Sequence, residues 1–349
     1  MLSKNIASKS SSLLDLLSQH DNDYSFLEKG YFLKNNIDLL SKEVIVATNT
    51  FSKKISVIIP SFNSFDTIFG TLLTINNQVL SDSERDLLEV IVVDDGSTDN
   101  TKIRIHQQKY KFTLKYFKQD NLGRSAARNK GVDISTGETL IFLDSDVLLE
   151  KNFIREHALR CEALNKCVFI SFKDNIFLSA DKIFEFIRQD NKPNIEKDFR
   201  FSKFISPEWK RIHKVNNPVE TRIVRIIDES NNLKDFGRGR IIGVWDLPSI
   251  ALTCSISMSK KEFLKSGGFS LDFKGWGMED TFLGACLISN RNYFIPIYST
   301  GVFHIKHAYR SGNELNQINE FNKNVEVYNK LLEKKIDSIF YKNRDNLNL

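Results

Sequence analysis

Three observations predict an α/β fold built on a parallel, doubly wound sheet. Short apolar runs alternate with amphipathic helical patterns from residue 54 to about residue 145. Each run is uninterrupted, as expected of a strand that is buried on both faces. Polar clusters follow the runs, and ligands of such sheets bind outside the carboxyl ends of the strands.

The elements of this first half follow in order. Residues 55–60 (ISVIIP) form the first predicted strand. Residues 64–78 carry Ile68, Leu72 and Ile75 at offsets of zero, four and seven, which is typical of an amphipathic helix. The pattern then predicts a strand at 87–93, a helix ending near Tyr110, a strand at 112–117, a helix at 123–134 and a strand at 139–143.

The second half has a weaker pattern over residues 172–245. We expect an insertion with some helix and a mobile loop there, because prolines and the basic segment 236–240 (FGRGR) interrupt the periodicity. Beyond it the sequence predicts a strand at 250–258, a helix at 259–266 with Ser259 as N-cap, a helix at 279–290 and two short strands within 292–304.

The domain organisation expected from these patterns has three parts. Residues 1–50 are a helical extension, and residues 311–349 are a charged helical tail. Residues 51–310 form the main domain, with its first functional half at about 54–150 and its second at about 151–310.

Composition narrows the class of protein. A net charge of +5 over 349 residues is too small for a nucleic-acid-binding surface, although it suits phosphate-bearing small molecules. The four cysteines lack metal-type spacing and indicate a reducing compartment. With neither a membrane-spanning run nor a signal peptide in the sequence, we expect a cytoplasmic protein; peripheral membrane contact and the oligomeric state stay open.

Two carboxylates stand directly after the strand predicted at 139–143. In extended backbone alternate side chains point the same way, so we expect Asp144 and Asp146 on one side. Hard divalent cations bind carboxylate oxygens and would offset the charge that develops on a diphosphate leaving group. The structural alternative is a turn that caps a helix, but the position after the fourth strand favours a metal site.

A second polar cluster, residues 94–99 (DDGSTD), follows the second strand. A strand-end acid followed by glycine and small hydroxyls suits a nucleoside pocket, where a carboxylate accepts from a base N–H. The structural alternative is a tight turn with a helix cap. Both hold if Asp95 binds the base and Asp99 caps the next helix.

A third motif, residues 121–129 (NLGRSAARN), opens a predicted helix. Gly123 stands at the helix start, where unpaired backbone N–H groups favour anions. Arg128 would face a phosphate or brace the nucleoside loop. Taken in isolation, Arg128 fits an exposed helical arginine better.

A fourth motif, residues 275–280 (GWGMED), precedes a helix. A carboxylate within hydrogen-bond reach can take the proton of an acceptor hydroxyl as the new bond forms. Asp280 is the candidate base, Glu279 an acceptor-orienting neighbour and Trp276 an apolar face for a sugar ring. An acidic first helical turn is the structural alternative, but it does not explain a tryptophan between two glycines.

Two histidines near the end of the second half are candidate metal ligands. One imidazole would complete a metal shell opposite Asp146. A single histidine is more often structural. His304 is favoured over His307 because it directly ends the apolar pair at 302–303.

Together these motifs resemble the family-2 glycosyltransferases of GT-A fold, a Rossmann-like, mostly parallel sheet with helical additions. The resemblance covers about residues 54–160 and 250–310. Its segments are ISVIIPSFN, VIVVDDGSTDNT, NLGRSAARNKG, the DSD at 144–146 and GGFSLDFKGWGMEDTFLG. The GWGMED stretch also looks like the acceptor-side segment of chondroitin-polymerase domains and family-7 galactosyltransferases. One departure is Met278, where those relatives often have glycine, and it bears on the acceptor more than on the chemistry.

The resemblance implies a nucleotide-binding half and an acceptor half. Asp95 would contact uracil, and Asp144 would lie near the ribose or sugar of the donor. The full set of implied donor-binding residues is Pro60, Ser61, Asn63, Asp94, Asp95, Gly123, Arg128, Asp144 and Ser145.

The resemblance also implies a metal and a base. Asp146 and His304 would bind Mn²⁺ or Mg²⁺, with Asp144 and His307 as further candidate ligands. Asp280, assisted by Glu279, would be the base of an inverting single displacement. The acceptor would contact Trp276, Gly277 and Glu279.

The expected activity is metal-dependent transfer of a sugar from a nucleotide sugar, with a UDP-sugar favoured, to an acceptor hydroxyl in polysaccharide or oligosaccharide synthesis. The acceptor would be a glycan, a lipid-linked molecule or a peptide, and a peptide- or protein-directed enzyme is the first alternative. A nucleotidyltransferase would usually carry a Gly-rich basic loop after the first strand, which residues 60–63 lack. A non-catalytic nucleotide-sugar-binding module is the third alternative, and intact Asp144, Asp146 and Asp280 argue against it.

Overall fold

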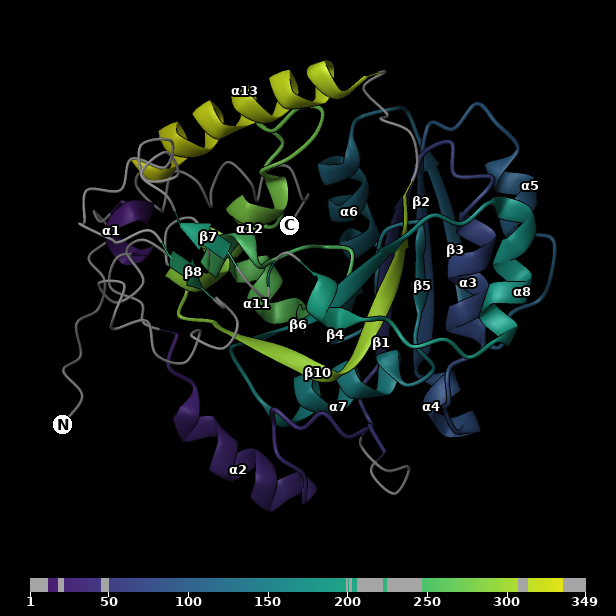
Figure 1. Ribbon diagram of the computed structural model, residues 1–349, viewed down its shortest axis with the longest axis horizontal. Coiled ribbons are helices and arrows are strands. Elements are labelled where there is room, and N and C mark those ends of the chain that lie inside the picture. The colour runs from purple at the N-terminus through teal and green to yellow at the C-terminus, as the bar shows by residue number, and fades with distance from the viewer. Residues whose placement is uncertain are drawn as a thin grey trace.

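The structure is a computed structural model that describes residues 12–17, 22–44, 50–198, 200, 203–205, 222–224, 247–306 and 313–334. Within these residues an eight-stranded sheet in the order β3-β2-β1-β4-β9-β6-β10-β5 forms the centre of the molecule (Figure 1). Helices cover both faces of the sheet. The α/β class expected from the sequence is therefore confirmed.

One half of the sheet is parallel. Its strands are β1 (Ile55–Ser61), β2 (Leu88–Asp95), β3 (Thr113–Gln119) and β4 (Thr139–Phe142). All eight residues of β2 and all four of β4 are buried. This burial explains their continuous apolar sequence, since neither face of these strands meets water.

The other half mixes directions. Its strands are β5 (Val147–Leu149), β6 (Cys167–Ile176), β9 (Ile256–Ser259) and β10 (Tyr293–Ile305). β9 runs antiparallel to β4 and β6, β10 runs parallel to β6, and β5 runs antiparallel to β10. A separate two-stranded pair joins β7 (Lys203–Ile205) to β8 (Arg222–Val224).

Two apolar clusters cover the two faces of the sheet. One face packs on α3 (Ile68–Asn76), α5 (Thr101–Ile105) and α7 (Phe153–Ala163). The opposite face packs on α6 (Arg124–Asp133), α11 (Lys260–Lys265) and α12 (Glu279–Ser289). Alternation along β1 sorts its side chains between the two clusters, with Val57 on the first face and Ile58 on the second. The remaining short elements are α4 (Asp82–Asp86), η1 (Ala180–Lys182), α8 (Ile183–Arg188), η2 (Ile195–Lys197) and α10 (Leu247–Ser249).

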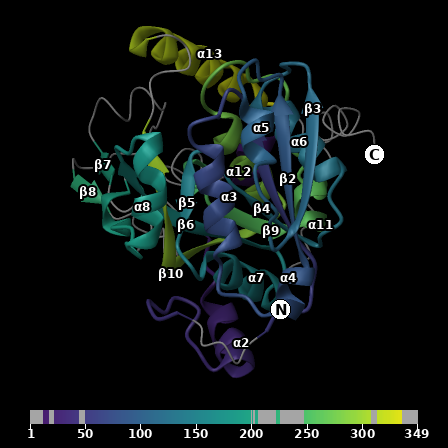
Figure 2. The ribbon, with the colours of Figure 1, turned by 90° about the vertical axis from the view of Figure 1, so that its right-hand side faces the viewer.

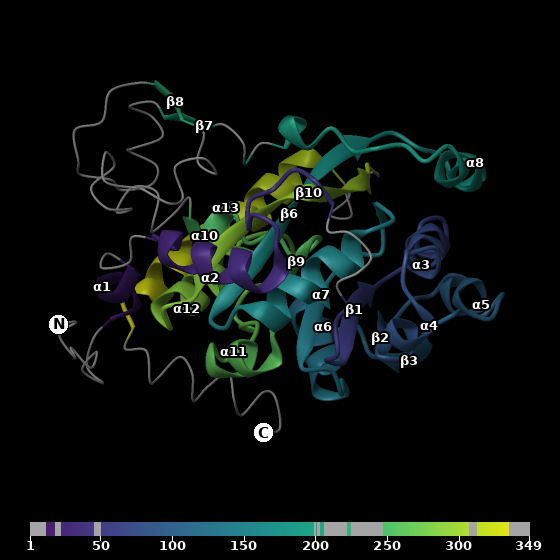
Figure 3. The ribbon, with the colours of Figure 1, turned by 90° about the horizontal axis from the view of Figure 1, so that it is seen from below.

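Helices from both ends of the chain pack against this body. Leu13 and Leu17 of α1 (Leu13–Leu17) and Tyr328 of α13 (Glu314–Leu332) belong to the same apolar cluster as α12. Tyr31 of α2 (Ser25–Asn35) packs in a separate cluster with β6 and β10. Figure 3 shows α1 at the opposite end of the molecule from α3 and α5. Among the described residues no helix combines the length and the apolar character needed to cross a membrane.

The prediction of a strand at 250–258 is wrong for residues 250–255. Strand β9 begins only at Ile256, and the preceding residues form a turn after α10. The turn is closed by local bonds, such as that from the Ser255 N–H to the Leu252 carbonyl, and tied to the sheet by tertiary ones, such as that from Ser255 Oγ to the Ser171 carbonyl. An apolar run cannot reveal such partners.

Other boundaries also differ. The two short strands expected within 292–304 are one strand, β10, with an irregular register between Pro296 and Gly301. A proline has no N–H for the ladder, so a local irregularity is enough and no strand break is needed. The helix expected to end near Tyr110 ends at Ile105. Most of the insertion at 172–245, including the segment 236–240, lies outside the described residues, and so does the tail beyond 334.

Candidate active site

The polar clusters meet at one edge of the parallel strands. Ser61 ends β1, Asp94 and Asp95 end β2, and the segment 144–146 follows β4. Because β1 pairs in parallel with both β2 and β4, these three ends lie side by side. The topology therefore gathers segments that are more than eighty residues apart.

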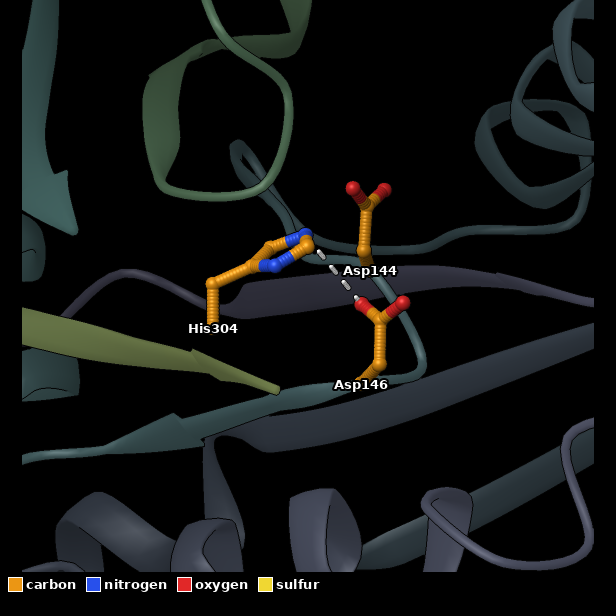
Figure 4. Close-up of side chains that lie close together, drawn as sticks. All are labelled: Asp144, Asp146 and His304. Carbon is orange, nitrogen blue, oxygen red and sulfur yellow. Dashed lines mark ion pairs between the residues drawn. The ribbon is translucent and has the colours of Figure 1, made fainter. Parts of the chain in front are cut away.

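Three of the predicted metal ligands lie together. One ligand atom each from Asp144, Asp146 and His304 lies within 4.8 Å of the others (Figure 4). His304 Nε2 is 3.6 Å from Asp146 Oδ1. The antiparallel pairing of β10 with β5 places His304 opposite Val147, directly after the DSD segment.

The donor set suits a divalent cation. Two carboxylates and one imidazole are ligands that Mg²⁺, Mn²⁺ or Zn²⁺ accept. Asp146 is buried, whereas Asp144 and His304 are half-buried. The group of three side chains is therefore partly accessible to a ligand. His307 lies outside the described residues.

Arg128 connects the two acidic motifs. Its guanidinium lies 2.9 Å from Asp144 Oδ1, 3.3 Å from Glu279 Oε1 and 3.4 Å from Asp280 Oδ1. The side chain is 2% exposed, so the alternative of an exposed helical arginine is wrong. Residue type alone does not show whether an arginine on α6 faces the sheet or the solvent. Burial opposes the charge, but Asp280, Asp144 and Glu279 outweigh it and raise the pKa of Arg128.

The carboxyls around Arg128 are in different electrostatic states. Burial and the charge of Glu279 raise the pKa of Asp280 to about 7, against the opposing effect of Arg128. Burial also acts on Asp144, but Arg128, then His304 and Arg124, lower its pKa to about 2. Asp144 is therefore held ionised while Asp280 titrates near neutral pH, a separation typical of sites that pair a fixed charge with a proton acceptor.

Thr253 holds Asp280 and was not found from the sequence. Its backbone N–H donates to Asp280 Oδ2 at 3.1 Å, and its hydroxyl donates to Oδ1 at 3.0 Å. Thr253 lies on the turn before β9, in the stretch that the sequence suggested was strand. No local signal marks a threonine that bonds to a residue 27 positions away.

Asp94 and Asp95, the last two residues of β2, accept hydrogen bonds from the segments around them. Asp95 accepts from the N–H groups of Leu122 and Gly123, each at 2.9 Å. Asp94 accepts from the N–H of Ser97 at 2.7 Å and from the hydroxyl of Tyr116 at 2.6 Å. The N–H of Gly123 that was expected to face an anion is thus bonded to Asp95, and the roles of these residues toward a donor stay predictions.

The remaining nucleotide-side residues link the loops to one another. Asn63 has a left-handed backbone, with φ of 47°, and its Oδ1 accepts from the N–H of Thr98 at 2.9 Å. Ser145 and Ser64 are joined through their hydroxyls at 2.8 Å. Pro60 and Ser61 end β1. Asp99 accepts from the N–H of Thr101, the first residue of α5, as expected of a cap-like contact.

The loop before α12 has an unusual backbone. Gly275, Gly277 and Met278 have φ of 72°, 95° and 72°. Only glycine adopts such angles without strain. Met278 therefore takes up a backbone that glycine adopts more readily. A small cavity of about 40 Å³ adjoins this loop, and Arg124, Lys274 and Glu279 contribute to its lining.

Comparison with known proteins shows similarity in sequence and in fold. Residues 56–215 match the family model described as Glycosyl transferase family 2. Over these residues the chain is similar to family-2 glycosyltransferases, and its fold is of GT-A type. GalNAc-T7, solved with UDP, GalNAc and Mn²⁺, has the same fold; the TM-score is 0.53 at 15% identity, over 85% of this chain and 54% of that one.

Individual relatives match parts of the chain by sequence. A validoxylamine A glucosyltransferase of Streptomyces hygroscopicus subsp. limoneus is 26% identical over 236 residues, covering 66% of this chain and 47% of the relative. A poly(ribitol-phosphate) beta-N-acetylglucosaminyltransferase, TarP of Staphylococcus aureus (strain N315), is 33% identical over 106 residues, covering 30% of this chain and 32% of the relative. The chain spans half or less of the length of these relatives.

Proposed function

We propose that this domain transfers a sugar from a nucleotide-sugar donor, with a UDP-sugar favoured, to an acceptor hydroxyl with inversion at the anomeric carbon. One observation carries the proposal. Arg128 contacts Asp144 of the candidate metal group and Asp280 of the candidate base at once. A cation-binding group and a proton acceptor in one site match what glycosyl transfer from a diphosphate requires.

Asp144, Asp146 and His304 would hold the divalent cation, Mn²⁺ or Mg²⁺. When bound, the cation offsets the negative charge of the diphosphate leaving group. Arg128 keeps Asp144 ionised and in place through the 2.9 Å contact between them. The family name and the UDP and Mn²⁺ in the GalNAc-T7 structure support this choice of donor and metal.

Asp280 would act as the base. Thr253 fixes the plane of its carboxylate with two hydrogen bonds. Oδ1 also accepts from Arg128, so Oδ2 has the second lone pair for the acceptor O–H. The acceptor proton passes to Asp280 while the acceptor oxygen bonds to the anomeric carbon and the bond to the diphosphate breaks. A single displacement of this kind inverts the configuration.

The acceptor side would comprise Trp276, Gly277 and Glu279, within a catalytic domain at residues 51–310. Relatives named for glucosylation of validoxylamine A and for modification of poly(ribitol-phosphate) support a hydroxyl-bearing acceptor of carbohydrate type. We therefore place glycans and lipid-linked glycans before peptides as acceptors.

Release of nucleoside diphosphate tests the proposal. Purified protein is incubated with UDP-glucose, UDP-galactose, UDP-N-acetylglucosamine and GDP-mannose, with Mn²⁺, Mg²⁺ or EDTA, and with and without carbohydrate acceptors. We expect release from a UDP-sugar that needs a divalent cation and increases with acceptor. Donor binding without release in every combination would instead support the non-catalytic binding module.

The variant Asp146→Ala tests whether Asp146 binds the metal. It should lose the part of UDP-sugar binding that depends on Mn²⁺, measured by calorimetry with and without EDTA. Asp99→Ala is a matched control, because Asp99 lies at the same sheet edge but outside the candidate metal group. Unchanged metal-dependent binding in Asp146→Ala would exclude this ligand.

A further inference from the structure

The C-terminal helix α13 contacts the loop that leads to the candidate base. Figures 1 and 2 both place α13 above α12. The loop at 274–278, which leads into α12, is hydrogen-bonded to α13. Asn324 lies at the centre of the contact and is 3% exposed. Its Nδ2 donates to the carbonyls of Lys274 at 2.9 Å, Trp276 at 3.1 Å and Gly277 at 2.9 Å. Its Oδ1 accepts from the N–H of Lys274 at 3.3 Å.

Neighbouring residues of α13 extend the contact. Glu320 Oε2 accepts from the N–H of Trp276 at 3.0 Å. The rings of Phe321 and Trp276 lie 5.7 Å apart between centroids, at an angle of 45°. One asparagine and one glutamate therefore satisfy most of the polar backbone of a short loop that has no regular structure of its own.

The two glycines permit this close approach. A Cβ on Gly275 would lie 2.6 Å from Cδ of Glu320, and a Cβ on Gly277 would lie 2.7 Å from Cδ2 of Phe321. Both distances are too short for real carbon atoms, and both glycines also have positive φ. The contact with α13 thus accounts for the glycines on either side of Trp276.

The helix is itself fixed to the domain. Tyr328, Leu331 and Leu332 of α13 lie in the apolar cluster that contains Phe282 of α12. The rings of Tyr328 and Phe282 meet edge to face at 6.3 Å. Since Glu279 and Asp280 begin α12, α13 has a defined position relative to the candidate base.

We propose that Asn324 is a positioning residue for acceptor binding, and that α13 is part of the acceptor site. Asn324 fixes the 274–277 loop, so that Trp276 and Phe321 present one aromatic surface beside Glu279. Trp276 and Phe321 are 39% and 36% exposed, so part of each residue is open to a sugar ring of a carbohydrate acceptor. The inference rests on the proposed function, because the acceptor is defined by that reaction.

Hydrogen exchange tests the contact without any substrate. Asn324→Ala removes the amide that holds the loop, so the backbone N–H groups of peptides covering residues 272–278 should exchange about tenfold faster or more by mass spectrometry. Asn322→Ala is the matched control, because Asn322 is exposed on the same helix two residues away. Peptides of β2 should exchange unchanged in both variants and report that the domain stays folded.

Kinetics test the role in acceptor binding. With the donor and acceptor that the wild-type protein turns over, Asn324→Ala should raise the acceptor KM about tenfold, because a displaced loop no longer orients that substrate. The donor KM and the acceptor-independent release of UDP should stay within twofold of wild type. Asn324→Asp should behave as Asn324→Ala does, since a carboxylate cannot donate to three carbonyls.

The outcomes separate the two proposals. A wild-type protein that transfers no sugar contradicts the proposed function. Unchanged exchange at 272–278 in a folded Asn324→Ala protein overturns the positioning role, whatever the wild-type activity. Faster exchange with an unchanged acceptor KM overturns it too, as does a variant whose donor and acceptor constants worsen equally.

Discussion

The two halves of this domain that we propose for nucleotide binding and for acceptor binding are built in different ways. In the nucleotide half, the loops after β1, β2 and β3 bond to one another, as Asp95 does to Leu122 and Gly123. In the acceptor half, Asp280 is held by Thr253 and Arg128, and its preceding loop is held by Asn324. The first half can therefore be recognised from contiguous motifs, whereas the second depends on side chains scattered along the chain.

The carboxyl groups of Asp144 and Asp280 also differ in ionisation. Asp144 lies at the boundary between the halves and is kept ionised by Arg128. Asp280, on the acceptor side, has a pKa raised to about 7. One arginine thus contributes to both halves, and changes to Arg128 should affect both halves at once.

The largest effect is expected for Asp280→Asn. Loss of the proton acceptor should lower kcat at least about a hundredfold, because general bases contribute rate factors of this order. The donor Kd should stay within about threefold of wild type, since Asp280 contacts Arg128 and Thr253 and does not belong to the metal group. Transfer assays and donor titration measure the two quantities. Retained transfer would remove Asp280 from the mechanism.

Arg128→Met should weaken both halves together. It leaves Asp144, Glu279 and Asp280 without their shared cation, and breaking one side of a buried ion pair costs about 3–5 kcal/mol. Urea unfolding measures the change. Lys130→Met is the control, because Lys130 lies on the same helix but pairs with Asp133 at the surface. An equal loss of stability in Arg128→Met and Lys130→Met would show that the buried ion pairs of Arg128 contribute no more than a surface pair.

The pH dependence should reflect Asp280. The base must be ionised to accept a proton, so kcat/KM at saturating donor should rise with pH, with a midpoint near the pKa of about 7. For folding the sign is opposite. A carboxyl whose pKa rises from 3.8 to about 7 on folding favours the native state below 3.8, and this contribution is lost as pH rises through 7.

The same linkage gives a second measurement for this prediction. The melting temperature of Asp280→Asn relative to wild type should be higher at pH 8 than at pH 5, because asparagine has no proton to lose. A difference that does not change with pH, together with a flat rate profile, would contradict the raised pKa of Asp280.

The smallest effect is expected at Thr253. Thr253→Val removes one hydrogen bond to a carboxylate but keeps the backbone N–H, so transfer at pH 7 should fall about tenfold. The rising limb of the pH profile should move to higher pH, because the lost bond stabilised the ionised form. Thr253→Ser should restore both. A Thr253→Ser protein as slow as Thr253→Val would mean that the methyl group matters rather than the hydroxyl.

Much of the fold was predictable from the sequence, for a local reason. The strands β1, β2, β3 and β4 and the helices α3 and α6 were located to within a few residues, because burial on both faces and amphipathic periodicity leave marks in contiguous residues. The elements from α7 to β6 went unassigned. Strand β9 was started too early because the apolar residues before it form a turn, and an apolar run by itself does not distinguish a turn that is bonded both locally and to distant partners from a strand.

The sequence by itself determined the motifs and the strands that they follow, whereas the side-by-side order of those strands in the sheet came from the structure. The sequence could identify Asp144, Asp146, His304 and Asp280 as candidates, since residue type and position after a strand suffice for that. Only the tertiary structure decided that Arg128 is buried between the acidic motifs, that Thr253 orients Asp280 and that Asn324 holds the loop. Threonine, asparagine and arginine are ordinary surface residues in sequence, and only the partners that folding brings to them give these three their roles.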